Sequence, residues 1–100
     1  MKSERVMAHY SGRVQGIGFR YSCRRLAMGF SVTGSVQNLE DGRVELVAEG
    51  DREEVEEFLR AILESHLKPF IRQCTTNWQP ATGEWSGFLI EPPGKSGIKN

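Results

Sequence analysis

A strand-like run meets a helix-like run in the stretch Gly12-Arg13-Val14-Gln15-Gly16-Ile17-Gly18-Phe19-Arg20. Apolar residues alternate with polar ones before it, which predicts a strand over residues 5–14. Apolar and small residues recur at helical spacing after it, which predicts a helix that begins near Phe19 and ends near Gly29. The two closely spaced glycines therefore mark a tight connection between a strand and a helix.

This connection has the construction of an anion-binding site. The first N–H groups of a helix have no acceptor within the helix and lie at the positive end of its dipole, so they favour a phosphate group. Arg20 falls in the first turn and adds a planar guanidinium that can bind two phosphate oxygens. The simpler alternative is that Gly16 and Gly18 only permit a turn and that Arg20 is one solvated arginine among several.

Two better-known phosphate motifs are excluded. Tyr21 stands where a dinucleotide-binding fingerprint needs its third small residue, and no GxxxxGK[ST] sequence is present. The sequence therefore predicts neither a Rossmann dinucleotide site nor a P-loop nucleotide hydrolase.

The remainder of the chain predicts further strands and one more helix. Turn chemistry at residues 39–42 predicts a hairpin, and Asp51 with Glu54 resembles a capping box at the start of the second helix. The predicted elements are strands over 30–36 and 43–49, a helix from Asp51 to near Ser65, and strands over 70–78 and 85–91. This order indicates an α+β, ferredoxin-like split βαβ (β-α-β-β-α-β) sandwich with two helices on one face of an antiparallel sheet. We expect one domain over residues 1–91 and a flexible tail over 92–100.

Composition limits the classes of partner. Thirteen basic and thirteen acidic residues cancel among 100, so the chain lacks the positive charge of a general nucleic-acid binder. No apolar run approaches the roughly 20 residues that span a bilayer. Two cysteines, Cys23 and Cys74, are too few for a disulfide framework or a metal site, and we expect buried thiols. We expect a cytoplasmic protein that contacts neither nucleic acid nor membrane.

The stretch 12–20 resembles the signature loop of the acylphosphatases. A second stretch, residues 34–45, is similar to the second strand and hairpin motif of that family, and residues 48–50 are similar to the end of its third strand. The resemblance implies hydrolysis of a small acyl phosphate to a carboxylate and inorganic phosphate, without metal or organic cofactor. It further implies that inorganic phosphate or sulfate can occupy the site, and we expect a monomer.

The resemblance also assigns roles to individual residues. Arg20 matches the essential phosphate-binding arginine of the family, and Asn38 matches the asparagine that positions the attacking water. The implied phosphate cradle is formed by the main-chain amides of Gln15, Gly16, Ile17, Gly18, Phe19 and Arg20. No histidine or carboxylate belongs to either motif, so we infer that the phosphoryl group itself helps to accept the proton of the water.

The sequence departs from the family pattern at two positions. Ser35 stands where the family often has an aromatic residue, and Gln37 where it often has a basic one. Neither is a proposed catalytic group, and their effect on the approach to the site stays open, as do the physiological acyl phosphate, the rate and the state of the thiols.

Two other functions are compatible with the same fold. The first is a non-catalytic acylphosphatase-like module that binds a phosphate ligand or a protein, because ferredoxin-like domains host many functions. The second is RNA binding on the open sheet face. It is disfavoured by the neutral charge balance and by the lack of an aromatic-rich strand.

Overall fold

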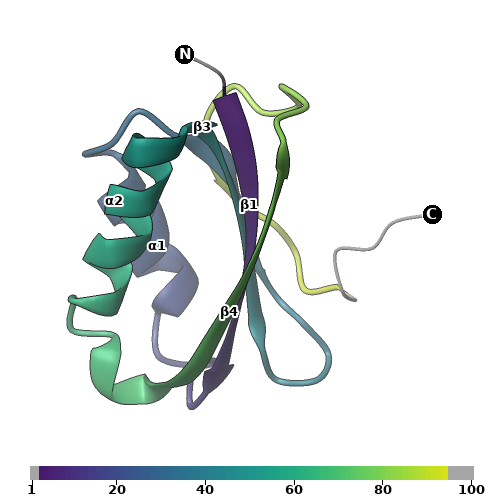
Figure 1. Cartoon of the computed structure of the whole chain (residues 1–100). Helices are drawn as coiled ribbons and strands as arrows, with labels where there is room; N and C mark the ends of the chain where they lie inside the picture. Colours follow the sequence, from purple (N-terminus) through teal and green to yellow (C-terminus); the bar gives the residue numbers. More distant parts are fainter. Residues whose placement is uncertain (1–2, 95–100) are drawn as a thin grey trace.

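The strands form one five-stranded sheet, and both helices cover the same face of it (Figure 1). The computed structural model describes residues 3–94. The elements are β1 (Ser3–Gly12), α1 (Phe19–Ala27), β2 (Thr33–Asn38), β3 (Val44–Asp51), α2 (Arg52–Leu63), a 3-10 turn η1 (Lys68–Phe70), β4 (Ile71–Pro80) and β5 (Phe88–Ile90).

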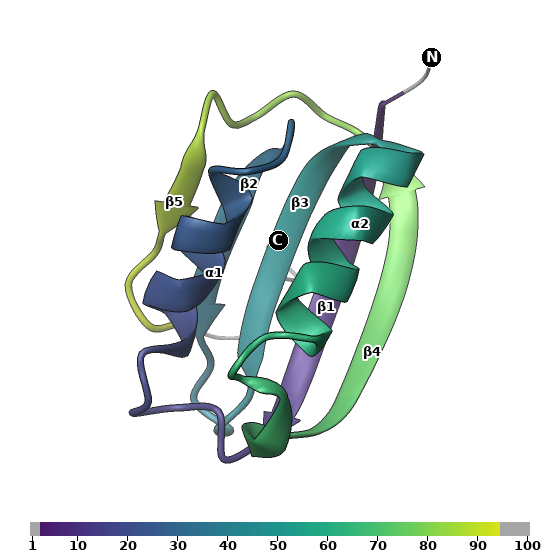
Figure 2. The same cartoon turned by 90° about the vertical axis from the view of Figure 1, so that its left-hand side faces the viewer.

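The order of the strands across the sheet is β4-β1-β3-β2-β5 (Figure 2). The pairs β1–β3, β1–β4 and β2–β3 are antiparallel, whereas β5 lies parallel to β2. The predicted ferredoxin-like architecture is confirmed, with the correction that the last strand makes the sheet mixed. This occurs because residues 81–87 carry the chain from one edge of the sheet to the other, where β5 joins β2 in the parallel sense.

The core lies between the sheet and the two helices. Alternation along β1 places Val6, Ala8 and Tyr10 on the helix side, and all three are buried. The helices contribute their apolar stripes at 3.6-residue spacing. Their buried residues are Phe19, Cys23 and Ala27 from α1 and Val55, Phe58 and Ile62 from α2.

The predicted capping box at the start of α2 is wrong. Asp51 is the N-cap residue, but its side chain makes no capping hydrogen bond, and it still pairs with Ser3 as the last residue of β3. The Glu54 carboxylate instead accepts a hydrogen bond from the main-chain N–H of Ser31 at 2.9 Å. Glu54 thus fixes the segment before β2, a long-range role that local sequence does not reveal.

Cys23 is fully buried, and Cys74 is half-buried. The two thiols are free of any disulfide, and burial raises the pKa of each. No helix within residues 3–94 is long and apolar enough to cross a membrane, and the same residues contain no group of three side chains suited to hold a metal ion.

Candidate active site

The connection between β1 and α1 is built on two glycines in left-handed conformation. Gly16 has φ 81° and Gly18 has φ 79°, a region that residues with a Cβ enter only at an energetic cost. Gly18 is also the N-cap residue of α1, and its carbonyl accepts the hydrogen bond of Ser22 N–H at 2.9 Å. The glycines thus let the chain reverse and start the helix at Phe19.

The start of α1 presents unpaired donors. The N–H groups of the first helical residues have no intrahelical acceptor, and α1 carries no acidic residue in its first turn. The Arg20 side chain is half-buried, and within residues 3–94 it makes no hydrogen bond or ion pair. A guanidinium and a helix N-terminus are therefore both available to an anion at the same place.

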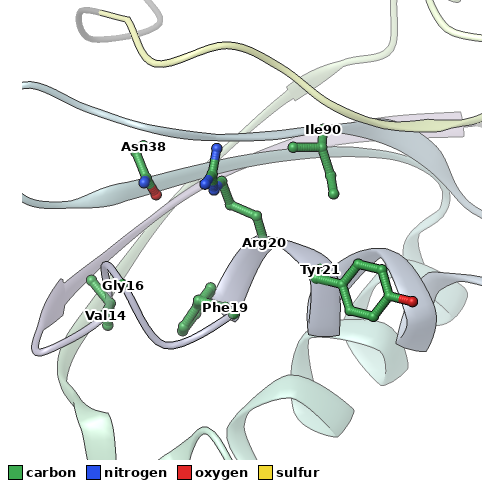
Figure 3. Close-up of a pocket in the computed structure, with 8 residues that line it drawn as sticks. Val14, Gly16, Phe19, Arg20, Tyr21, Asn38 and Ile90 are labelled. Atoms are coloured by element: carbon green, nitrogen blue, oxygen red, sulfur yellow. The ribbon is translucent and has the colours of Figure 1, made fainter.

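Asn38 is the last residue of β2 and pairs with Val44 of β3. Because side chains alternate along a strand, Asn38 lies on the same face as Val36, which is the face covered by the helices. Figure 3 shows the Arg20 side chain extending from the start of α1 toward the Asn38 side chain. The two predicted catalytic residues come from separate elements and meet at one site.

These residues line a pocket of about 160 Å³. A water needs about 10–15 Å³ of such space, so the pocket has room for a group of several heavy atoms. Its lining residues are Val14, Gly16, Gly18, Phe19, Arg20, Tyr21, Asn38 and Ile90 (Figure 3).

Two predicted cradle residues, Gln15 and Ile17, do not line this pocket. Ile17 packs against the core. The Gln15 side-chain amide donates to the main-chain carbonyls of Leu39 and Arg43, both at 2.9 Å. Gln15 therefore joins the β1–α1 loop to the turn that follows Asn38, a role for its side chain that sequence reasoning missed.

Sequence reasoning also missed three lining residues, Val14, Tyr21 and Ile90. Tyr21 follows Arg20 on the helix, and its ring is directed away from Arg20 and Asn38 (Figure 3). Ile90 reaches the site because β5 pairs in parallel with β2, so that Ile90 lies opposite Val36. Only the topology of the sheet brings Ile90 there, whereas the helical position of Tyr21 was visible in the sequence.

The turn between β2 and β3 contains the carboxylate of Asp41, which does not line the pocket. The main-chain N–H of Arg43 hydrogen-bonds Asp41 at 3.1 Å, and the Arg43 guanidinium pairs with the same carboxylate at 2.9 Å. These interactions lower the pKa of Asp41 and give its charge a local partner. The buried carboxylates Glu45 and Glu49 lie on β3 with side chains on the opposite face, away from the phosphate loop.

Comparison with known proteins identifies the family to which this arrangement belongs. The family model described as Acylphosphatase matches residues 6–90, which include the loop, Arg20 and Asn38. The chain belongs to the acylphosphatase family. It is 44% identical over 87 residues to an acylphosphatase of Acidothermus cellulolyticus, a match that covers 84% of this chain and 83% of that relative. By this homology it is an acylphosphatase, and membership of the family implies acyl phosphate substrates.

Solved structures agree with the family assignment. The crystal structure of acylphosphatase from Bacillus subtilis superposes with a TM-score of 0.80 at 28% identity, covering 88% of this chain and 98% of that one. Full-length HypF in its phosphate- and nucleotide-bound form superposes with a TM-score of 0.82 at 25% identity, covering 96% of this chain and 13% of HypF. The acylphosphatase fold thus accounts for nearly all of the chain.

Proposed function

We propose that this acylphosphatase hydrolyses small acyl phosphates with Arg20 and the loop amides as the phosphate site and Asn38 as the residue that orients water. The observation that carries the proposal is the Arg20 guanidinium, which has no protein partner among residues 3–94 and extends toward Asn38 beside an uncapped helix N-terminus. The amides assigned to the phosphate are those of Gln15, Gly16, Ile17, Gly18, Phe19 and Arg20.

The proposed mechanism relies on orientation and charge. An acyl phosphate already carries a good leaving group, a carboxylate, so the site has only to hold the phosphoryl group and aim the nucleophile. Arg20 and the amides stabilise negative charge on the nonbridging oxygens as it redistributes in the transition state. A sparse site of one guanidinium, main-chain donors and one carboxamide is sufficient for this reaction.

The bonds change in a single displacement at phosphorus. The oxygen of a water oriented by the Asn38 carboxamide forms a bond to phosphorus, in line with the bond to the acyl oxygen, which breaks with its electron pair. A nonbridging phosphoryl oxygen takes one proton of the attacking water. The products are the carboxylate and inorganic phosphate.

Steady-state hydrolysis of acetyl phosphate in the presence of a chelator tests these roles. Arg20→Ala should lower kcat/KM at least 100-fold, because a preorganised charged donor is lost. Asn38→Ala should lower kcat by about the same factor while the inhibition constant of inorganic phosphate changes little. Arg24→Ala is the matched control, because Arg24 is an exposed arginine of the same helix with no hydrogen bond or ion pair in residues 3–94. Full activity of Arg20→Ala would refute the proposal.

A second candidate is a non-catalytic phosphate-binding or protein-binding module. It is favoured by the similarity to HypF, in which a domain of this fold is a small part of a much longer chain. Phosphate affinity that depends on Arg20, without hydrolysis of a panel of acyl phosphates, would select this alternative.

A cytoplasmic location, a monomeric state and the absence of nucleic-acid and membrane partners stay part of the proposal. The domain limit at residue 91 stays a prediction, and the chain continues to pair with the β2 side of the sheet as far as Gly94. Size-exclusion chromatography with light scattering tests the monomer. Of the tail assigned to residues 92–100, residues 95–100 lie outside the described part of the chain.

A further inference from the structure

The chain continues to pair with β2 beyond the end of β5. The main-chain N–H of Glu91 donates to the Val36 carbonyl at 2.9 Å. Three residues later, Gly94 N–H donates to the carbonyl of Asn38 at 3.0 Å. The segment Glu91–Gly94 therefore extends the parallel ladder along β2 as far as the catalytic asparagine.

The register of this ladder shifts by one residue on the way. Ile90 lies opposite Val36, a difference of 54, whereas Gly94 forms a bridge with Leu39, a difference of 55. The shift in register falls at Pro92 and Pro93, and neither residue has a main-chain N–H to donate to β2. Because proline fixes φ, the two prolines restrict the segment that delivers Gly94 to Asn38.

The segment around Asn38 is consequently held on both sides. On one side, Asn38 pairs with Val44, and Leu39 N–H donates to the Arg43 carbonyl at 2.9 Å. On the other side, Gly94 bonds the Asn38 carbonyl, and its own carbonyl accepts from Glu40 N–H at 3.1 Å. Without Gly94, this second side would lose both hydrogen bonds, one to the Asn38 carbonyl and one from Glu40 N–H, that bracket Leu39, the residue after Asn38.

Gly94 also lies close to the neighbouring side chain on β2. A Cβ added to Gly94 would lie 3.0 Å from Gln37 Oε1, a flexible side-chain atom. Alanine keeps the donor to Asn38 but requires the Gln37 side chain, whose amide bonds Glu45 at 2.9 Å, to move by a few tenths of an ångström, whereas proline would remove the donor. This difference provides a matched pair of variants.

The family match ends at residue 90, before this segment begins. We propose that Glu91–Gly94 is a positioning element of the site, and that Gly94 is the positioning residue through which it holds Asn38 in the orientation that aims water. The inference rests on the proposed role of Asn38. Gly94 does not line the pocket, and its main-chain hydrogen bonds go to Asn38 and Glu40, so its effect should reach the reaction through Asn38.

Loss of the Gly94 hydrogen bonds should lower turnover and leave phosphate binding nearly unchanged. A displacement of about 1 Å of a catalytic group can lower a rate by about 100-fold, so loss of the Gly94 bonds should lower kcat between about 10- and 100-fold. The inhibition constant of inorganic phosphate should stay within about twofold, because Arg20 and the loop amides are untouched. If the segment only stabilised the fold, its loss would lower the fraction of active protein, or it would change kcat and the phosphate inhibition constant together.

The experiment compares truncation after Pro93 with truncation after Lys95, and Gly94→Pro with Gly94→Ala, in acetyl phosphate hydrolysis well below the melting temperature. Truncation after Pro93 and Gly94→Pro should lose kcat, while truncation after Lys95 and Gly94→Ala keep it. When truncation after Pro93 or Gly94→Pro is combined with Asn38→Ala, it should cause no further loss of kcat, because the effects of substitutions at coupled residues are not additive. An equal loss in the Asn38→Ala background, a parallel rise in the phosphate inhibition constant, or no loss at all would overturn the inference.

Asn38→Ala alone keeps the two claims apart. If it loses turnover while truncation after Pro93 does not, the positioning element is wrong and the proposed function stands. If Asn38→Ala retains the turnover of the full-length protein, the proposed role of Asn38 fails, and the positioning inference falls with it.

Discussion

Gln15 and Leu39 are joined by a hydrogen bond of 2.9 Å from the side-chain amide of Gln15 to the main-chain carbonyl of Leu39. Leu39 directly follows Asn38, so this bond connects the β1–α1 loop to the residue beside Asn38, which we propose positions the water. The second hydrogen of the same amide bonds the Arg43 carbonyl on the other arm of the turn. One side chain thus fixes the distance between the two halves of the site.

Gln15→Leu should reduce turnover more than stability. Both carbonyls keep a main-chain donor after the change, since Gly42 N–H bonds Leu39 and Leu39 N–H bonds Arg43. Neither is left unsatisfied, so we expect a loss of about 1 kcal/mol in the free energy of unfolding. kcat should fall about tenfold, because the loop and Asn38 are no longer tied together. Urea unfolding and acetyl phosphate kinetics measure the two effects.

Gln73→Leu is the control for this variant. Gln73 is an exposed residue of β4 with no side-chain hydrogen bond within residues 3–94. It should leave both turnover and stability unchanged. Equal turnover in Gln15→Leu and Gln73→Leu would mean that the loop and the turn hold their places without the amide bridge.

Gly18→Ala should lower stability and activity together, because Gly18 has φ 79° and the added methyl group meets open space. The cost is therefore one of backbone conformation, about 1–2 kcal/mol. Gly83→Ala isolates that cost, since Gly83 has φ 74° and is equally open but lies in the loop before β5. The two variants should show similar losses in thermal unfolding, whereas only Gly18→Ala should weaken phosphate binding. Matching phosphate affinities would argue against the loop as the cradle.

Glu49 should make stability depend on pH in the acid range. Burial acts to raise its pKa, but hydrogen bonds from the main-chain N–H groups of Thr82 and Gly83 and from the Arg5 guanidinium outweigh burial and lower the pKa. A lowered pKa stabilises the folded protein above the ordinary glutamate pKa of about 4.3, and this stability is lost as pH falls through the folded value.

Glu49→Gln should therefore cost stability at neutral pH and little at low pH. At pH 7 the loss should be about 2 kcal/mol, because charge-assisted hydrogen bonds are removed. The difference from the unmutated protein should shrink below about pH 4 in urea unfolding. Glu84→Gln, which alters the more exposed partner of Arg5, should change stability by less than about 1 kcal/mol. A Glu49→Gln loss that stays constant down to pH 3 would contradict the lowered pKa.

The sequence was sufficient for the parts of the site that are local. Gly16 and Gly18 between a strand pattern and a helix pattern predicted the turn, and helical spacing placed Arg20 in the first turn of α1. The family resemblance then predicted Asn38. The turn and the place of Arg20 depend on residues that are neighbours in the chain, where backbone preferences act directly, whereas Asn38 came from the resemblance alone.

The rest depends on contacts between distant residues. Nothing near Glu54 indicates that it bonds Ser31 instead of capping its own helix. The pairing of Gly94 with Asn38 requires β5 to run parallel to β2, which follows from the crossing of residues 81–87 over the sheet. Such relationships are set by tertiary packing, and a pattern within one segment carries no information about them.

Amide chemical shifts during a titration with inorganic phosphate test the central claim most directly. We expect the N–H resonances of residues 15–20 to shift together with one dissociation constant, and we expect Arg20→Ala to weaken this binding while Arg24→Ala leaves it unchanged. Shifts that avoid residues 15–20, or that persist at full affinity in Arg20→Ala, would contradict the phosphate site on which the proposed function rests.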